Sequence, residues 1–279
     1  MKTNVAPPWL VTALALSLAA SLSAAPPQDV PAAQQAEPVY QSSSERRVVQ
    51  DRQWGPWLGP FRAKLVPSLM QDFGERYLYA AANAALADPR PGEQRVVFLG
   101  DSITDRWNLA RSFPGKPYVN RGIGSQVTAQ MILRFHQDVV ALKPAAVVIL
   151  AGVNDVQGFL QQETPEQIEA NWESMADLAD RHGIRVIFGS LLPINNYTEP
   201  ARDVVKERDP ATLRQLNAWL KGLCKARGYI YADYYAAMVD DRGLLSRNLT
   251  TDGIHPLTAG YDRMAPIAQA AIVKALARR

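Results

Sequence analysis

Short apolar runs alternate with amphipathic segments over most of the chain. The apolar runs have the length of β-strands buried on both faces, and they comprise residues 95–99, 145–152, 184–190 and 229–232. The intervening segments carry apolar residues at helical spacing, and they comprise residues 126–143, 165–182, 211–228 and 258–277. This alternation predicts an α/β protein with a mostly parallel sheet and helices on both faces, a three-layer αβα sandwich.

The segments before this domain have other patterns. Residues 26–44 are rich in Pro, Ala, Gln and Ser, a composition typical of a flexible linker. Residues 45–90 show helical periodicity, which Pro67 divides and Pro89 ends. We therefore predict an N-terminal helical arm over 45–90, followed by one catalytic or binding domain over 91–279.

The first 25 residues have the anatomy of a secretory signal peptide. Lys2 precedes an apolar run that ends in small residues, with a cleavage site near Ala24/Ala25. The run is shorter than the ~20 residues that a membrane-spanning helix needs. We expect a secreted or periplasmic protein with no stable membrane insertion after signal cleavage; an uncleaved N-terminal anchor is the alternative.

Polar residues follow the first apolar run, where the predicted strand ends. In open α/β sheets, ligand-binding and catalytic groups collect at the carboxyl ends of the strands. Ser102 stands here after Gly100 and Asp101, and Asp105 follows at the spacing of a helix capping box. Ser102 is therefore either a helix cap or a nucleophile presented beside backbone N–H groups.

Two later strand ends offer hydrogen-bond donors. Gly122 and Gly124 flank Ile123 ahead of a helix, so this loop either exposes backbone N–H groups to an anionic oxygen or simply turns the chain. Asn154 follows a long apolar run. Its side-chain amide either donates into the same crevice or closes a turn through its own backbone.

Asp252 precedes His255 by three residues, just ahead of the last predicted helix. In a tight loop this spacing lets the carboxylate bond one imidazole nitrogen while the other faces outward as a base. For His182 we expect a helix C-terminus, where it suits the helix dipole, and for His136 a solvated or boundary position. A serine, oxyanion donors and an Asp/His pair on successive strand ends form a combination that capping and turn formation do not predict.

Four sequence blocks resemble those of the GDSL/SGNH hydrolase family, in the family's order: "GDSIT" at 100–104, "NRGIG" at 120–124, "GVND" at 152–155 and "DGIH" at 252–255. The resemblance covers about residues 95–266 and implies a flavodoxin-like sandwich with esterase or lipase-type acylhydrolase activity. It extends to secreted carbohydrate esterases and relatives of platelet-activating-factor acetylhydrolase. The implied catalytic residues are Ser102, Asp252 and His255, and the implied oxyanion hole is formed by Ser102, Gly124 and Asn154. Ser125 departs from the family, which often has a second glycine there.

Composition and charge exclude several other classes. With 279 residues, 47% of them hydrophobic, the chain can bury a full core. The net charge of +3 is scattered, so we expect no nucleic-acid partner. The single cysteine, Cys224, excludes an internal disulfide and offers no cluster for a metal. The serine-based set needs neither a metal nor an organic cofactor.

We therefore expect a serine esterase that removes short acyl groups, such as acetyl, from a small-molecule or carbohydrate ester. The absence of a long apolar lid segment favours short chains. The alternatives are a lipase or lysophospholipase-type hydrolase, an acyltransferase that uses the same acyl-enzyme, and a non-catalytic carbohydrate- or envelope-binding module. The sequence carries no signal for an oligomeric state.

Overall fold

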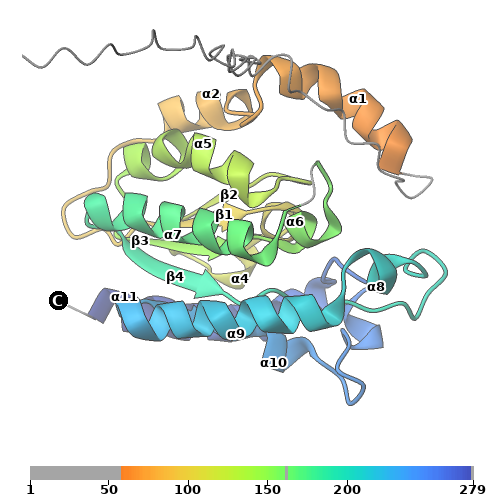
Figure 1. Ribbon diagram of the computed structural model, residues 1–279. Coiled ribbons are helices and arrows are strands. Elements are labelled where there is room, and N and C mark those ends of the chain that lie inside the picture. The colour runs from red at the N-terminus through yellow and green to blue at the C-terminus, as the bar shows by residue number, and fades with distance from the viewer. Residues whose placement is uncertain (1–57, 161–162, 278–279) are drawn as a thin grey trace, which may run out of the picture. The chain divides into compact units, whose positions relative to one another are not determined.

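A five-stranded parallel sheet forms the centre of the molecule (Figure 1). The computed structural model describes residues 58–160 and 163–277, so the predicted signal peptide and linker lie outside the described residues. The strand order is β2-β1-β3-β4-β5. The strands are β1 (Val96–Gly100), β2 (Tyr118–Gly122), β3 (Ala146–Leu150), β4 (Arg185–Gly189) and β5 (Ile230–Ala232).

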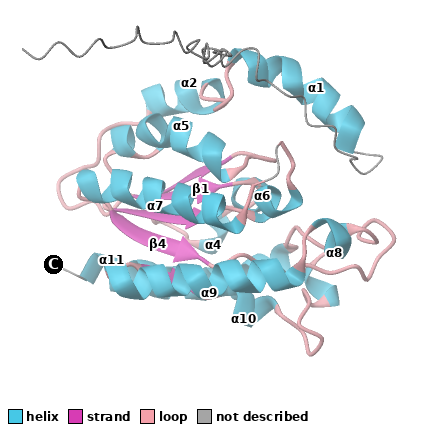
Figure 2. Ribbon diagram, in the orientation of Figure 1, coloured by secondary structure: helices cyan, strands magenta, loops and turns pink. Residues whose placement is uncertain are grey.

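Helices cover both faces of this sheet (Figure 2). Successive strand residues point to opposite faces, so Val97 of β1 enters one buried cluster and Phe98 the other. The first cluster is completed by α5 (Thr128–Asp138), α7 (Pro165–Arg181) and α9 (Pro210–Arg227). The second is completed mainly by α11 (Thr258–Ala277) and α10 (Tyr234–Met238). The predicted αβα sandwich is confirmed.

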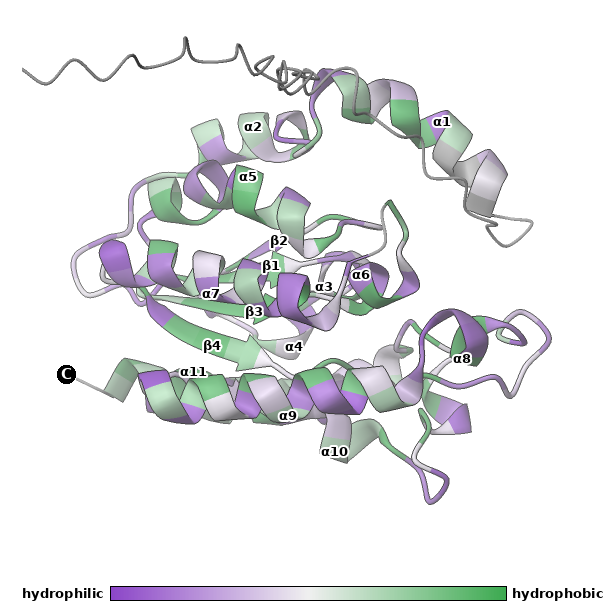
Figure 3. Ribbon diagram, in the orientation of Figure 1, coloured by the Kyte–Doolittle hydropathy of each residue, from purple (hydrophilic) through white to green (hydrophobic). Residues whose placement is uncertain are grey.

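The covering helices are amphipathic, whereas the strands are uniformly apolar. In Figure 3, α7 and α9 alternate between hydrophilic and hydrophobic residues, while β4 is mostly hydrophobic. Every residue of β1 and of β3 is buried. The difference follows from position, since a central parallel strand has no solvent face and an outer helix has one.

Shorter elements connect this framework. They are α1 (Leu58–Gln71), α2 (Tyr77–Ala85), α3 (Ser102–Asp105), α4 (Leu109–Ser112), α6 (Val153–Gln157), α8 (Val204–Glu207) and the 3-10 turns Val140–Leu142 and Arg247–Leu249. Leu65 of α1 packs beside Val127 and Phe159, and α2 lies beside α5. None of the helices within 58–160 and 163–277 is long and apolar enough to cross a membrane.

Two predicted helices differ from the observed ones. The helix predicted over 126–143 ends at Asp138, and a 3-10 turn over Val140–Leu142 buries Leu142 before the chain enters β3. In the arm, Pro67 lies inside α1 and does not divide it. The break falls instead before α2, where Glu75 has a φ of 51° in the left-handed region. Backbone geometry there, rather than proline, separates the two helices.

Candidate active site

Three predicted site residues form a continuous hydrogen-bonded chain at the carboxyl edge of the sheet. Ser102 Oγ lies 2.8 Å from His255 Nε2, and His255 Nδ1 lies 2.7 Å from Asp252 Oδ2. The other carboxylate oxygen of Asp252 accepts the backbone N–H groups of Ile254, at 3.0 Å, and His255, at 2.9 Å. The carboxylate thus holds both the backbone and the ring of His255, so that Nε2 faces the serine hydroxyl.

Ser102 is presented by the turn between β1 and α3. Asp101 is the N-cap of α3, since its carboxylate accepts the N–H of Ile103 at 2.9 Å. The interpretation of Ser102 as the cap is therefore wrong: Ser102 is the first helical residue, and its hydroxyl turns to His255. The turn requires glycine before it, because a Cβ on Gly100 would lie 2.2 Å from Thr104 Oγ1 and 2.4 Å from the Leu150 carbonyl oxygen.

The loop that carries Asp252 and His255 is held by its neighbours. The Thr250 hydroxyl oxygen accepts the N–H of Gly253 at 3.0 Å, and the Gly253 carbonyl accepts the N–H of Asn195 at 3.0 Å. Gly253 has a φ of 81°, and a Cβ there would lie 2.3 Å from the Asn195 carbonyl oxygen. This close approach explains how three residues can place the carboxylate against the imidazole.

Asp252 is ionised at neutral pH. Burial opposes ionisation, but hydrogen bonds from the imidazole and the backbone N–H of His255 outweigh it and hold the pKa of the Asp252 carboxyl well below its ordinary value. A carboxylate at Nδ1 selects the tautomer in which Nε2 carries the lone pair. His255 Nε2 can then accept a proton from the Ser102 hydroxyl.

Gly124 lies beside the serine, and Asn154 is linked through Gln126 to the chain that follows Gly124. A Cβ on Gly124 would lie 3.9 Å from Ser102 Cβ, so this glycine borders the nucleophile position. Asn154 lies inside α6, and its Nδ2 donates to the Gln126 carbonyl at 3.0 Å. This bond uses one of the two amide hydrogens. The hydrogen bond that the structure gives the Asn154 side chain is to Gln126 and not to the backbone of Asn154 itself.

Ser125 adopts the left-handed backbone conformation, with a φ of 70°. This conformation costs a non-glycine residue roughly 1–2 kcal/mol. The departure from the family pattern therefore places strain next to Gly124. The loop keeps its shape against that strain because neighbouring contacts hold it.

Two further carboxyl groups brace the site. Burial raises the pKa of Asp101 to about 6 and that of Asp155 to about 7. Asp155 Oδ1 accepts the backbone N–H of Thr128 at 2.9 Å and its hydroxyl at 2.5 Å, which ties α6 to the start of α5. Both carboxyl groups therefore have structural roles, Asp101 as the cap of α3 and Asp155 as the link between α6 and α5.

A cavity of about 390 Å³ opens beside His255. Its lining combines charged and apolar side chains, namely Glu199, Pro200, Arg202, Asp203, Val204, Glu207, Asp252, Ile254 and His255. The mixture suits a polar ligand with a small apolar part. No set of three or more His, Cys, Asp or Glu side chains within 58–160 and 163–277 is arranged to hold a metal ion.

Three other polar residues lie outside the hydrogen-bonded chain of Ser102, His255 and Asp252. Asn195 is 1% exposed, donates to the Leu245 carbonyl at 2.7 Å and closes a turn onto Tyr197. His182 follows the last residue of α7, and His136 is exposed on α5, both as expected. Sequence reasoning missed Gln126, whose carbonyl holds Asn154. Its position directly after the glycine-flanked loop was the available signal.

Comparison with known proteins agrees with this geometry. The model of the GDSL-like Lipase/Acylhydrolase family matches residues 98–263. A GDSL-like lipase from Bacteroides thetaiotaomicron is 38% identical, with a TM-score of 0.68 over 73% of this chain and 100% of its own. An acetylxylan esterase from Geobacillus stearothermophilus is 25% identical over 60% of this chain and 89% of its own length.

A solved structure of a catalytic mutant of an acetylxylan esterase from G. stearothermophilus shares the fold. It has a TM-score of 0.53 and 21% identity over 69% of this chain and 99% of its own. The family match covers more than half of the chain, and the B. thetaiotaomicron protein is aligned along its whole length. The chain therefore belongs to the GDSL-like lipase/acylhydrolase family and is an ester hydrolase.

Proposed function

We propose that the chain is a serine esterase with Ser102 as nucleophile, His255 as general base and Asp252 as the group that orients and stabilises His255. One observation carries the proposal: the unbroken hydrogen-bonded chain from Ser102 Oγ through His255 to Asp252. Such a chain activates a hydroxyl that is otherwise a weak nucleophile at neutral pH.

In the first half-reaction, Ser102 Oγ bonds to the ester carbonyl carbon while its proton moves to His255 Nε2. The carbonyl oxygen becomes an oxyanion, which the backbone N–H groups of Ser102 and Gly124 and the amide of Asn154 stabilise. The carbon–alkoxy bond then breaks, and the departing alcohol takes the proton from His255. In the second half-reaction water gives a proton to His255 while its oxygen bonds to the acyl carbon. The bond from that carbon to Ser102 Oγ then breaks, His255 returns the proton to Ser102 Oγ, and the acid leaves.

We further propose that the acyl group is short, such as acetyl, and that the alcohol is a carbohydrate. Two observations support this choice of substrate. The similar protein from G. stearothermophilus is an acetylxylan esterase. Besides Asp252, four charged side chains line the cavity beside His255, which suits a hydroxyl-rich alcohol better than a lipid chain; they are Glu199, Arg202, Asp203 and Glu207.

The test compares initial hydrolysis rates on p-nitrophenyl esters from acetate to palmitate, followed by acetylated xylo-oligosaccharides, for the natural chain and Ser102→Ala. We expect a maximum at acetate that Ser102→Ala abolishes, and release of acetate from the oligosaccharide. A maximum at long chains would replace the carbohydrate substrate with a lipid ester. Product that appears as a new ester when a free sugar is added would indicate acyl transfer, and undiminished activity in Ser102→Ala would refute the nucleophile.

A further inference from the structure

We propose that Gln126 is a positioning residue that holds the Asn154 amide in the oxyanion hole and that is itself held by the segment between α1 and α2. The inference rests on the proposed function, since it assigns Gln126 a part in the same oxyanion hole. It also gives the N-terminal helical segment a role in catalysis that its distance along the chain from Ser102 does not suggest.

The side chain of Gln126 is buried, with 1% exposure, and every polar atom of it is engaged. Its Nε2 donates to the Gly74 carbonyl at 3.1 Å and to Glu75 Oε2 at 3.1 Å. Its Oε1 accepts from Arg134 Nε at 2.6 Å. Because the Gln126 backbone carbonyl accepts from Asn154 Nδ2, rotation of this residue would release the Asn154 amide.

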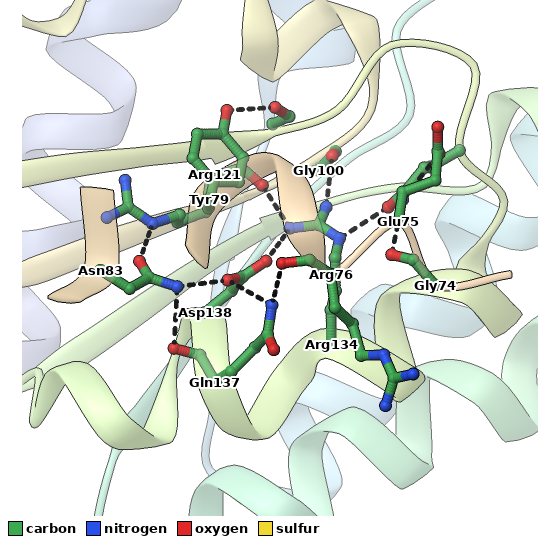
Figure 4. A network of polar contacts seen from close by, with 12 residues as sticks. Gly74, Glu75, Arg76, Tyr79, Asn83, Gly100, Arg121, Arg134, Gln137 and Asp138 are labelled. Atoms are coloured by element: carbon green, nitrogen blue, oxygen red, sulfur yellow. Dashed lines mark hydrogen bonds and ion pairs between the residues drawn. The ribbon is translucent and has the colours of Figure 1, made fainter. Parts of the chain in front are cut away.

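Arg134 extends the same network to the strand ends that lead into the site (Figure 4). Its guanidinium is fully buried and pairs with Asp138 at 3.1 Å. It also donates to the carbonyl of Gly100 at 3.0 Å and to that of Arg121 at 2.8 Å. Gly100 ends β1 two residues before Ser102, and Arg121 precedes the glycine-flanked loop. The Arg134 side chain therefore sets the spacing between the end of β1 before Ser102, the end of β2 before the loop over residues 122–125, and Gln126.

The backbone is strained on both sides of the hydrogen bond between Gln126 and Glu75. Ser125, directly before Gln126, has a φ of 70°, and Glu75, which accepts from Gln126, has a φ of 51°. Non-glycine residues keep this conformation only where surrounding contacts hold it. The Tyr79 hydroxyl adds a third tie from the N-terminal segment, a bond to the Gly122 carbonyl at 2.5 Å.

Gln137 supplies a matched control. Like Gln126, it is a glutamine that donates to a backbone carbonyl of the N-terminal segment, here Arg76 at 2.6 Å. Its other bond goes to Asp138 at 3.3 Å, within α5. The Gln137 side chain thus holds the same N-terminal segment, but its bonds go to Arg76 and Asp138 and not to the loop over residues 122–125. Loss of docking alone affects both variants, whereas loss of oxyanion positioning affects only Gln126→Ala.

The experiment measures kcat and KM on p-nitrophenyl acetate for Gln126→Ala, Gln137→Ala, Asn154→Ala and the double variant Gln126→Ala/Asn154→Ala, with melting temperatures for each. We expect Gln126→Ala to lower kcat about tenfold with little change in KM, because small misplacements of a transition-state donor are costly. Gln137→Ala should keep its kcat. The double variant should be no slower than Asn154→Ala, because the two residues act through one group.

Each failure has its own signature. Full activity in Asn154→Ala would refute the oxyanion role in the proposed function, and the positioning role with it. A loss in Asn154→Ala without a loss in Gln126→Ala, or two losses that multiply in the double variant, would refute the positioning role alone. An equal loss in Gln137→Ala would also refute it, since docking would then explain the effect.

A milder pair keeps the test decisive if Gln126→Ala does not fold. Glu75→Gln retains an oxygen that accepts from Gln126 Nε2, and Glu75→Ala removes it. We expect Glu75→Ala to lower kcat about threefold, since the Gly74 carbonyl still holds Gln126, and Glu75→Gln to restore it. Equal kcat values in the two variants would overturn the proposal.

Discussion

Ser102 Oγ lies 2.8 Å from Nε2 of His255, although 153 positions separate the two residues in the chain. If this contact activates the nucleophile, Ser102→Ala and His255→Ala should each lower kcat on p-nitrophenyl acetate by about 10⁴-fold or more. Their double variant should lose little beyond either single variant, because the pair acts as a unit. Melting temperatures close to that of the natural chain are the control, and losses that multiply would contradict the paired role.

Asp252→Asn should lower kcat by about 10²- to 10⁴-fold while leaving KM nearly unchanged. Asparagine keeps an oxygen for the N–H groups of Ile254 and His255, but it loses the charge that favours protonated His255 and the acceptor that selects the tautomer. Steady-state kinetics on a short ester measure both parameters. Near-full activity of the variant would mean that Ser102 and His255 suffice without the carboxylate.

Asp155 should make the protein less stable as the pH rises from about 4 to 7. Burial raises the pKa of its carboxyl to about 7 in the folded chain, from an unfolded value near 3.8. Between these two pH values the folded state binds more protons than the unfolded state. Protonation of Asp155 therefore stabilises the fold at low pH, and this stabilisation is lost as the pH rises through the folded pKa. Asp155→Asn keeps an oxygen for Thr128 and removes the titration.

The measurement is the free energy of unfolding of both proteins at pH 5 and pH 8. The natural chain should lose more stability over this interval than Asp155→Asn, with a slope difference of at most about 1.4 kcal/mol per pH unit. Asp101, whose pKa is also raised, titrates in both proteins and so cancels in the comparison. Parallel pH profiles would contradict the prediction.

Two neighbouring glycines should respond differently to alanine. A Cβ on Gly122 would lie 2.1 Å from the backbone nitrogen of Asp105, whereas the nearest atoms to a Cβ on Gly124 lie at 3.8 and 3.9 Å. Gly122→Ala should therefore cost about 3 kcal/mol or more of stability, because β2 must move away from α3. Gly124→Ala should fold normally and lower kcat, since the new methyl group lies beside Ser102. Thermal melts and ester hydrolysis separate the two effects, and equal melting temperatures would be the opposing result.

Ser125→Gly should stabilise the protein by about 0.5–1 kcal/mol, because relief of the left-handed strain exceeds the added entropy of a glycine in the unfolded chain. Ser125→Val should destabilise it, since a β-branched residue tolerates this conformation worse than serine. Chemical denaturation of both variants is the measurement. A destabilised Ser125→Gly would show that the serine side chain contributes more than its backbone strain costs.

Much of the fold could be predicted from local pattern. The last helix runs from Thr258 to Ala277 as predicted, and Thr164 caps α7 with its hydroxyl oxygen accepting the N–H of Gln167. Both features depend on periodicity and on hydrogen bonds within a few residues. The three-residue spacing of Asp252 and His255 likewise predicts their pairing, although the loop that brings them together is held by its contact with Asn195. Helix ends were less predictable where packing intervenes, as at Asp138.

The sequence by itself determined the alternation of strands and helices, the family blocks and the identities of Ser102, Asp252 and His255, because these are written in short segments. Only the tertiary structure decided that Asp101 rather than Ser102 caps α3, and that Gln126 joins Glu75 to Asn154. Two capping residues side by side are equivalent in local pattern, and the contact with His255 distinguishes them. Contacts across dozens of residues leave no periodic signal, since they arise only when packed elements bring distant side chains together.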